Sequence, residues 1–167
     1  AVGVRAAGNG LVNVSVIGGE HFFEGCELEG GAIGLSVVGE GKVSLSGCRV
    51  AGAGVEGLSV AGAGFGEVSD LVLEGNGRGL SVSDRGVVKG KGVRIVGSAG
   101  HGAWVQGEAR AEVSALEADG NKGNGAYVTG VGYLKVDGGT LSGNGCGVSC
   151  EGGRVEARRE QVRAQRV

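Results

Sequence analysis

A tetrapeptide that returns at a fixed interval constrains the fold of this chain more than any other feature. Gly-Leu-Ser-Val occurs three times and then recurs in altered form as Gly-Ala-Trp-Val, Gly-Ala-Tyr-Val and Gly-Val-Ser-Cys. These six copies begin at evenly spaced anchor glycines: Gly34, Gly57, Gly79, Gly102, Gly125 and Gly147. A period of roughly 22–23 residues indicates a repeat fold in which each unit packs mainly on its two neighbours.

Each repeat unit contains three short segments in which apolar and polar residues alternate. One unit shows them at residues 35–37, 43–45 and 48–50, and the Val-Asn-Val sequence at 12–14 is an earlier copy of the first segment. Alternation with a period of two is typical of β-strands. Three strands and three turns within one such period close one coil of a parallel β-solenoid. Each strand then pairs with its own copy about 4.8 Å along the axis.

The composition agrees with this fold, because the 167 residues include 40 Gly and no Pro. Solenoid corners need residues that accept a positive φ or a close backbone approach, as Gly does, whereas Pro in an interior strand would remove a ladder hydrogen bond. Asn76, Asn121 and Asn144 recur at one corner, and we expect them to stack. The sequence therefore predicts an all-β, single-stranded parallel β-helix of about six to seven coils over residues 1–153.

The period, the inward aliphatic positions and the Gly and Asn corners resemble the right-handed parallel β-helix of the pectin-lyase-like superfamily, over roughly residues 10–153. That superfamily contains pectate lyases, polysaccharide hydrolases, phage tailspikes and non-enzymatic repeat proteins. The resemblance therefore implies a right-handed coil and leaves the function open. Its enzymes typically place carboxylates together with Arg or Lys on an outer sheet face, to bind calcium or to act on a sugar chain.

Such a catalytic cluster requires matching outward positions on adjacent coils, and the sequence does not show one. The aspartates Asp70, Asp84, Asp119 and Asp137 fall at different phases of the repeat, and we interpret the glutamates as scattered and solvent-facing. The two histidines lie far apart in the sequence, without a cysteine or second histidine at ligand spacing. We therefore predict no catalytic residue, no metal site and no cofactor, and expect the protein not to be an enzyme.

One group of outward positions stands out as a candidate ligand or partner surface. It combines residues that precede the anchor glycines with two aromatic residues of the first strand: Arg78, His101, Asn124, Trp104 and Tyr127. Glu56, one coil before Arg78, is placed to form an ion pair with it. Aromatic faces beside polar donors suit a carbohydrate or a peptide. The same residues also fit cross-coil packing with a surface ion pair.

The C-terminal residues 154–167 differ from the repeats, because they lack Gly and contain five Arg and two Glu. This composition predicts a helix, separate from the solenoid of residues 1–153. We expect it to cap the last coil, or to dock on an acidic partner, through Arg154, Arg158, Arg159 and Arg163.

Charge and cysteine usage limit the partners and the compartment. With 16 basic and 18 acidic residues the chain lacks the basic surface that non-specific nucleic-acid binding needs, and no apolar run is long enough to span a membrane. Cys26 and Cys48 share one inward column about 4.8 Å apart, farther than a disulfide prefers, so we predict free thiols. Unpaired cysteines slightly favour an intracellular location, which is otherwise unknown.

These observations favour a non-catalytic scaffold or protein-interaction module, belonging to a larger chain or assembly, with protein partners at the solenoid ends or on an outer face. The alternative is a carbohydrate-binding or polysaccharide-active β-helix in which Trp104 and Tyr127 stack on sugars.

Overall fold

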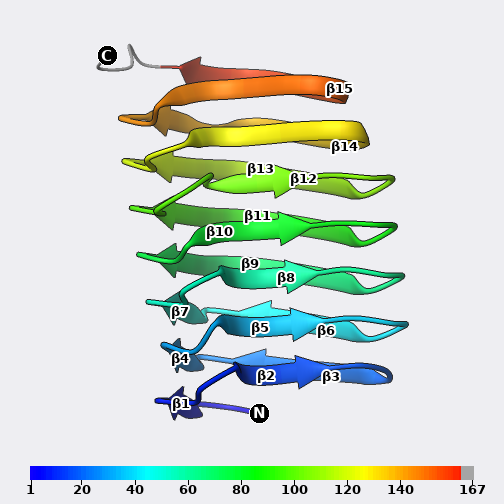
Figure 1. Cartoon of the computed structure of the whole chain (residues 1–167), viewed down its shortest axis with the longest axis vertical. Helices are drawn as coiled ribbons and strands as arrows, with labels where there is room; N and C mark the ends of the chain where they lie inside the picture. The colour runs from blue at the N-terminus through cyan, green and yellow to red at the C-terminus, as the bar shows by residue number, and fades with distance from the viewer. Residues whose placement is uncertain (163–167) are drawn as a thin grey trace.

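The computed structural model describes residues 1–162 and shows a parallel β-solenoid of about seven turns. Its strands stack along one axis, with the first and the last strand at opposite ends (Figure 1). Every pairing between strands is parallel and joins a strand to its equivalent on the next coil, as the period predicts. The predicted fold class is thus confirmed for the solenoid.

Each coil contributes one strand, or one part of a longer strand, to each of three ladders. The first ladder contains β2 (Val12–Val16), β5 (Ile33–Val37), β8 (Glu56–Val60), β10 (Arg78–Val82), β12 (Ala103–Val105) and the starts of β14 (Asn124–Ser142) and β15 (Cys146–Val162). The second ladder contains β3 (Glu20–Glu24), β6 (Lys42–Ser46) and the starts of β9 (Phe65–Glu74), β11 (Val87–Val96) and β13 (Arg110–Asp119), and continues in β14 and β15. The third ladder contains β1 (Arg5–Ala7), β4 (Glu27–Glu29), β7 (Arg49–Ala51) and the ends of the long strands.

The core consists of inward aliphatic columns from all three ladders. Leu35, Leu58 and Leu80 stack in register at no more than 1% exposure. The earliest copy of this column differs from the expectation, because Val14 and Val16 pair with Leu35 and Val37. The inward pair of β2 is therefore 14 and 16 and not 12 and 14, since the first interval is shorter than the later ones.

Five of the anchor glycines, from Gly34 to Gly125, are required by close backbone approach and not by a positive φ. A Cβ at Gly102 would lie 2.6 Å from the carbonyl oxygen of Gly125 and 2.9 Å from Nδ2 of Asn121. The equivalent position at Gly57 would lie 2.6 Å from Nδ2 of Asn76. The backbone cannot move enough to relieve contacts this short. A residue with a side chain is therefore excluded at these positions, where the corner asparagine packs against the glycine.

The predicted asparagine stack is present in part at the corner between the third and first strands, where Asn121 and Asn144 lie on adjacent coils and Ser98 separates Asn121 from Asn76. Asn76, Asn121 and Asn144 are each 1% exposed. Nδ2 of Asn121 donates to Oδ1 of Asn144 at 2.8 Å, and the backbone N–H of Ser98 donates to Oδ1 of Asn121 at 2.9 Å. Ser98 takes the asparagine's place on one coil, and its buried hydroxyl has no hydrogen-bond partner within residues 1–162. These side chains satisfy backbone groups that the turn would otherwise leave unpaired.

The predicted C-terminal helix is wrong, because β15 continues without a break from residue 146 to 162. It pairs with β14 from Asn124↔Cys146 to Leu141↔Val162. Val155 packs against the core, above Leu134, so the apolar alternation of the coil persists beyond residue 153. The exposed edge of β14 offers a full set of ladder hydrogen bonds, and these outweigh a helix propensity of a few tenths of a kcal/mol per residue.

The four cysteines are free thiols, as predicted, and Cys26 and Cys48 are buried. Sγ of Cys48 donates to the carbonyl oxygens of Phe23 and Ser46, and burial raises the pKa of this thiol. Cys150 points along an inward column but is exposed, because it belongs to the last coil. Residues 1–162 form no helix that is long and apolar enough to span a membrane.

Candidate functional site

The structure brings the five residues of the candidate ligand or partner surface together on the outside of the first ladder. Arg78 begins β10, His101 lies just before β12, Trp104 is in β12, and Asn124 and Tyr127 are in β14. Register places Trp104 directly between Ser81 and Tyr127 on neighbouring coils. We call this group the aromatic column.

Arg78 joins three coils. Its Nη2 lies 3.4 Å from Oε1 of Glu56 on the preceding coil, and its guanidinium carbon lies 4.2 Å from the Trp104 ring centroid on the following coil. The two ionised side chains are 27% and 13% exposed, so water screens them less than it screens an ordinary surface pair. The predicted ion pair is present and is coupled to a cation–π contact.

His101 and Tyr127 complete the aromatic column. Their ring centroids are 4.6 Å apart, and the rings of Trp104 and Tyr127 are stacked at 6.4 Å with an interplanar angle of 22°. Nδ1 of His101 accepts a hydrogen bond from the backbone N–H of Asn124 at 3.0 Å. Burial lowers the pKa of His101, and the Arg78 cation lowers it further. A hydrogen bond to Glu151 raises the pKa of the Tyr127 hydroxyl.

This geometry favours packing over ligand stacking, which are the two interpretations that the sequence left open. Arg78 approaches the Trp104 ring from the coil before it and Tyr127 from the coil after it, so neighbours occupy both sides of the indole along the axis. A sugar needs an uncovered ring face to stack on. Within residues 1–162 the indole N–H is buried without a partner, and it does not reach the surface as a donor.

A second site lies on the outer face of the second ladder, where the sequence analysis placed nothing. Adjoining shallow hollows run along this face, among them one of about 260 Å³ and one of about 500 Å³ that share Lys89 and Gly90 as lining residues. Another shares Ser44 and Glu67 with the larger of these. We call the outer face of residues 44–46, 67–69, 89–91, 112–114 and 135–137 the groove.

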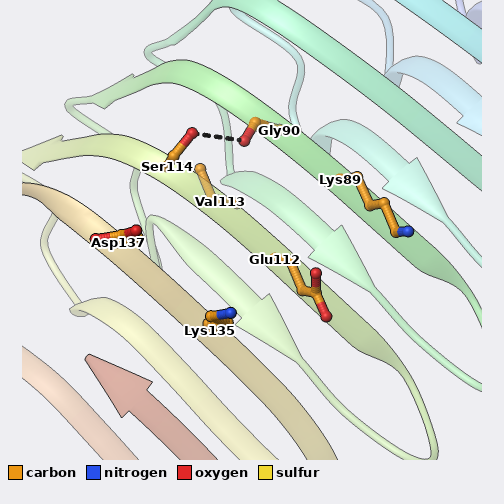
Figure 2. Close-up of a pocket in the computed structure, with 7 residues that line it drawn as sticks. All are labelled: Lys89, Gly90, Glu112, Val113, Ser114, Lys135 and Asp137. Carbon is orange, nitrogen blue, oxygen red and sulfur yellow. Dashed lines mark hydrogen bonds between the residues drawn. The ribbon is translucent and has the colours of Figure 1, made fainter. Parts of the chain in front are cut away.

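The central row of the groove alternates in charge from coil to coil. Strand register aligns four successive groove residues, Glu67, Lys89, Glu112 and Lys135, and the row continues beyond the groove in Glu156. Figure 2 shows Lys89, Glu112 and Lys135 on three neighbouring strands of the hollow, beside Ser114 and Asp137. The hydroxyl of Ser114 donates to the carbonyl oxygen of Gly90 on the preceding coil at 3.4 Å.

Ion pairing in the groove is uneven. Nη2 of Arg110 lies 2.6 Å from Oε1 of Glu112 on its own strand, and Arg154 is 2.6 Å from Glu156 in the same way. The hydrogen bond from Arg110 lowers the pKa of Glu112, which therefore stays ionised. Within residues 1–162, neither Lys89 nor Lys135 has a carboxylate within ion-pair distance.

The charged row of the groove could have been recognised in the sequence. It is spaced by the repeat interval, so the glutamates at 67, 112 and 156 hold one phase of the repeat and are not scattered as we had interpreted them. The aspartates do differ in place: Asp137 lines the groove, whereas Asp70 and Asp84 adopt positive φ. Aligning charged residues on the period, as well as apolar ones, would have found the row.

The C-terminal arginines are parts of a strand or lie beyond it. Arg154 follows Tyr133 in the second ladder, Arg158 is exposed and in register with Asp137, and Arg159 lies within β15. Arg163 lies outside the described residues. In the part of the chain that the structure describes, no group of three or more His, Cys, Asp or Glu side chains is placed to hold a metal ion.

Comparisons with known proteins find similarity in structure and none in sequence families. No protein-family model and no curated protein matches the chain. The periplasmic alginate epimerase AlgG matches with a TM-score of 0.70 and 16% identity, covering 90% of this chain and 44% of that enzyme. A single mutant of AlgG matches at 0.75 and 17%, covering 90% and 42%, and a double mutant at 0.71 and 16%, covering 98% and 47%.

These neighbours decide the fold. The chain shares the right-handed parallel β-helix fold of these neighbours. It spans less than half the length of the AlgG chains that it matches, and at this identity the likeness extends to the coil and not to individual residues.

Proposed function

We propose that this protein is a polysaccharide-binding β-helix whose ligand lies along the groove. The observation that carries the proposal is the row of lysines, hydroxyls and carboxylates along adjoining hollows on successive coils. A linear polymer can contact several coils of such a surface at once, and sheet residues hold the contacts in place at little cost in entropy. The fold of AlgG, which its name describes as an alginate epimerase, supports this ligand class.

The proposal concerns binding and assigns no acid–base pair. Lys89 and Lys135 are its main contacts, because their ammonium groups face the hollow without a paired carboxylate in the described part of the chain. They supply charge-assisted hydrogen bonds, which are about twice as strong as neutral ones.

Titration calorimetry with defined oligosaccharides tests the proposal. The probes are oligomers of polymannuronate, of hyaluronan and of a neutral β-glucan. We expect at least one acidic polymer to bind, and Lys89→Ala combined with Lys135→Ala to weaken that binding by about tenfold or more. The matched control is Arg85→Ala combined with Lys122→Ala, which removes two exposed cations outside the groove and should leave the affinity unchanged. Equal loss in both double variants, or no binding by any probe, would contradict the proposal.

A protein-interaction scaffold is the second candidate, and one observation favours it. Large apolar side chains are exposed on the first coil, where Leu11 is 77%, Ile17 70% and Phe22 61% accessible. Exposed apolar groups of this kind are typical of protein contact surfaces. Defined partners that co-purify with the protein and are lost on Phe22→Ser, together with no glycan binding, would favour the scaffold over the polysaccharide-binding function.

A further inference from the structure

The alternation of charge in the groove contains information about the ligand beyond its class. Anionic and cationic residues alternate in register on successive coils, in the order Glu67, Lys89, Glu112, Lys135 and Glu156. A linear ligand along the row therefore contacts a cation on every second coil. Neighbouring coils are about 4.8 Å apart, which separates Lys89 from Lys135 by about 9.6 Å.

Two anions of this row form ion pairs with arginines and not with the lysines, although Lys135 and Lys89 also help to lower the pKa of Glu112. Arg110 and Arg154 lie 2.6 Å from Glu112 and Glu156, each on the same strand as its partner. Both hydrogen bonds from Arg110 go to Oε1 of Glu112, and Glu112 lines the hollow, so its carboxylate can still accept a hydrogen bond from a ligand there. The groove therefore presents a cation on one coil and a hydrogen-bond acceptor on the next.

The spacing between the two lysines selects among polymers. In an extended peptide, side chains on one face recur every two residues, about 6.6 Å, which does not match about 9.6 Å. An extended chain of pyranose sugars advances by close to one coil per sugar, so two coils correspond to a disaccharide. A ligand that matches the row has one anionic sugar opposite each lysine and one uncharged sugar opposite each glutamate.

We propose that the groove selects an acidic polysaccharide in which a charged sugar alternates with an uncharged one. This inference rests on the proposed polysaccharide-binding function. An uncharged sugar donates hydroxyl hydrogen bonds to Glu112, whereas a carboxylate at the same place would be repelled. A polymer with a carboxylate on every sugar gains the two lysine contacts and suffers repulsion at every intervening coil, so the glutamates determine specificity and the lysines affinity.

The test compares polymers of equal length that differ in the spacing of their carboxylates. Hyaluronan carries one carboxylate per disaccharide, and polymannuronate carries one on every sugar. We expect hyaluronan oligosaccharides to bind about tenfold or more tightly than polymannuronate oligosaccharides at the same ionic strength. Glu112→Gln should raise the affinity for polymannuronate and narrow that ratio.

The matched control for this variant is Glu117→Gln. Glu117 lies on the same strand, β13, and pairs with Arg94 at 3.7 Å, but it belongs to the third ladder and not to the groove. It should leave the ratio unchanged. If polymannuronate binds as tightly as hyaluronan and the lysine variants weaken both, this inference fails and the proposed function stands.

The other outcomes separate the two proposals further. If only poly-glutamate binds, or if it competes better than hyaluronan, the groove is an acidic-peptide site and both proposals fail. If the neutral β-glucan binds as tightly as hyaluronan, polysaccharide binding holds and selection by charge spacing does not.

Discussion

Two outer faces of this solenoid each place an arginine over an aromatic ring, and they use the contact differently. On the first ladder, Arg78 lies 4.2 Å from the Trp104 centroid and is 27% exposed, and its partner Glu56 is 13% exposed. On the second ladder, Arg110 lies 4.3 Å from the Tyr133 centroid and is 52% exposed.

The difference lies in what each arginine joins. Arg78 contacts Glu56 on the coil before and Trp104 on the coil after, so it links three coils. Arg110 binds Glu112 on its own strand and contacts Tyr133 on the next coil. Half-buried contacts between coils stabilise the fold, whereas exposed contacts within a strand contribute little and leave charge available to a ligand. This difference agrees with the proposal that the second face binds a ligand, and it predicts that the first face stabilises the fold.

The largest expected effect is that of Trp104→Ala. It removes the ring that Arg78 and Tyr127 contact from both sides, and we expect it to lower the free energy of unfolding by about 2–3 kcal/mol. The Tm should then fall by about 5–10 °C. Calorimetric melting measures this change, and polysaccharide affinity should stay as in the parent protein.

Two control variants test whether the loss of stability comes from the stacked ring of Trp104. Trp104→Phe keeps a stacking ring and should recover part of the lost stability, whereas Tyr133→Ala on the groove side should leave the Tm nearly unchanged. An unaltered Tm in Trp104→Ala, together with lost affinity for a ligand, would contradict this prediction and make the aromatic column the binding site.

The coil could be predicted from the sequence because the residues that repeat with the period are the ones that face inward. Leu58 lies in a column of buried aliphatic residues, and Asn121 lies at a corner where asparagine recurs on other coils, so the three ladders and the corner asparagines could be predicted from the spacing of residue types. The prediction of a C-terminal helix was wrong because helix propensity takes no account of pairing with the edge of β14. Val155 pairs there and continues an inward column.

The groove was harder to foresee for a physical reason. Outward residues such as Lys89 and Glu112 are free to vary in size and charge, so they carry no apolar signal. Whether they form a binding site depends on the register between successive coils. It also depends on whether Arg110 pairs with a carboxylate of its own strand or of the next one. Rotamer choices of that kind are set by packing and cannot be deduced from spacing.

A second prediction concerns the corner below the aromatic column, where Ser98 takes the place of an asparagine. At Gly57, Gly102 and Gly125 an asparagine Nδ2 fills the space beside the anchor glycine, but at Gly79 Cγ2 of Ile95 fills it. Ser98→Asn alone should therefore overcrowd the corner and cost about 1–2 kcal/mol. Combined with Ile95→Leu, which matches Leu73 on the preceding coil, it should be compatible with the corner.

Urea unfolding of the two single variants and the double variant measures the coupling. We expect the double variant to be more stable than the sum of the single effects by about 1–2 kcal/mol, because the new Nδ2 can donate to the Leu73 carbonyl oxygen and the new Oδ1 can accept from the Asn76 N–H. Additive effects would mean that Ile95 and Ser98 do not compete for the same space.

The smallest expected effect is a pH dependence that belongs to the aromatic column alone. Burial and the Arg78 cation hold the pKa of His101 below the value of about 6.5 that it has in the unfolded chain. The folded state therefore favours the neutral ring, whose Nδ1 accepts the Asn124 N–H. Its contribution to stability is complete above about pH 6.5 and is lost as the pH falls through the folded-state pKa, since the unfolded state then binds the proton more readily.

Melting curves from pH 7 to pH 5 and an NMR titration of the ring check this prediction. His101→Asn keeps an acceptor for the Asn124 N–H without a titrating group, so it should lose part of the acid sensitivity, whereas His21→Asn on the second ladder should retain it. Arg78→Gln should raise the pKa of His101 part of the way, because burial remains when the cation is removed. If instead Lys89→Ala shifted this titration as much as Arg78→Gln, the two faces would be electrostatically coupled, and their division into a stabilising face and a binding face would fail.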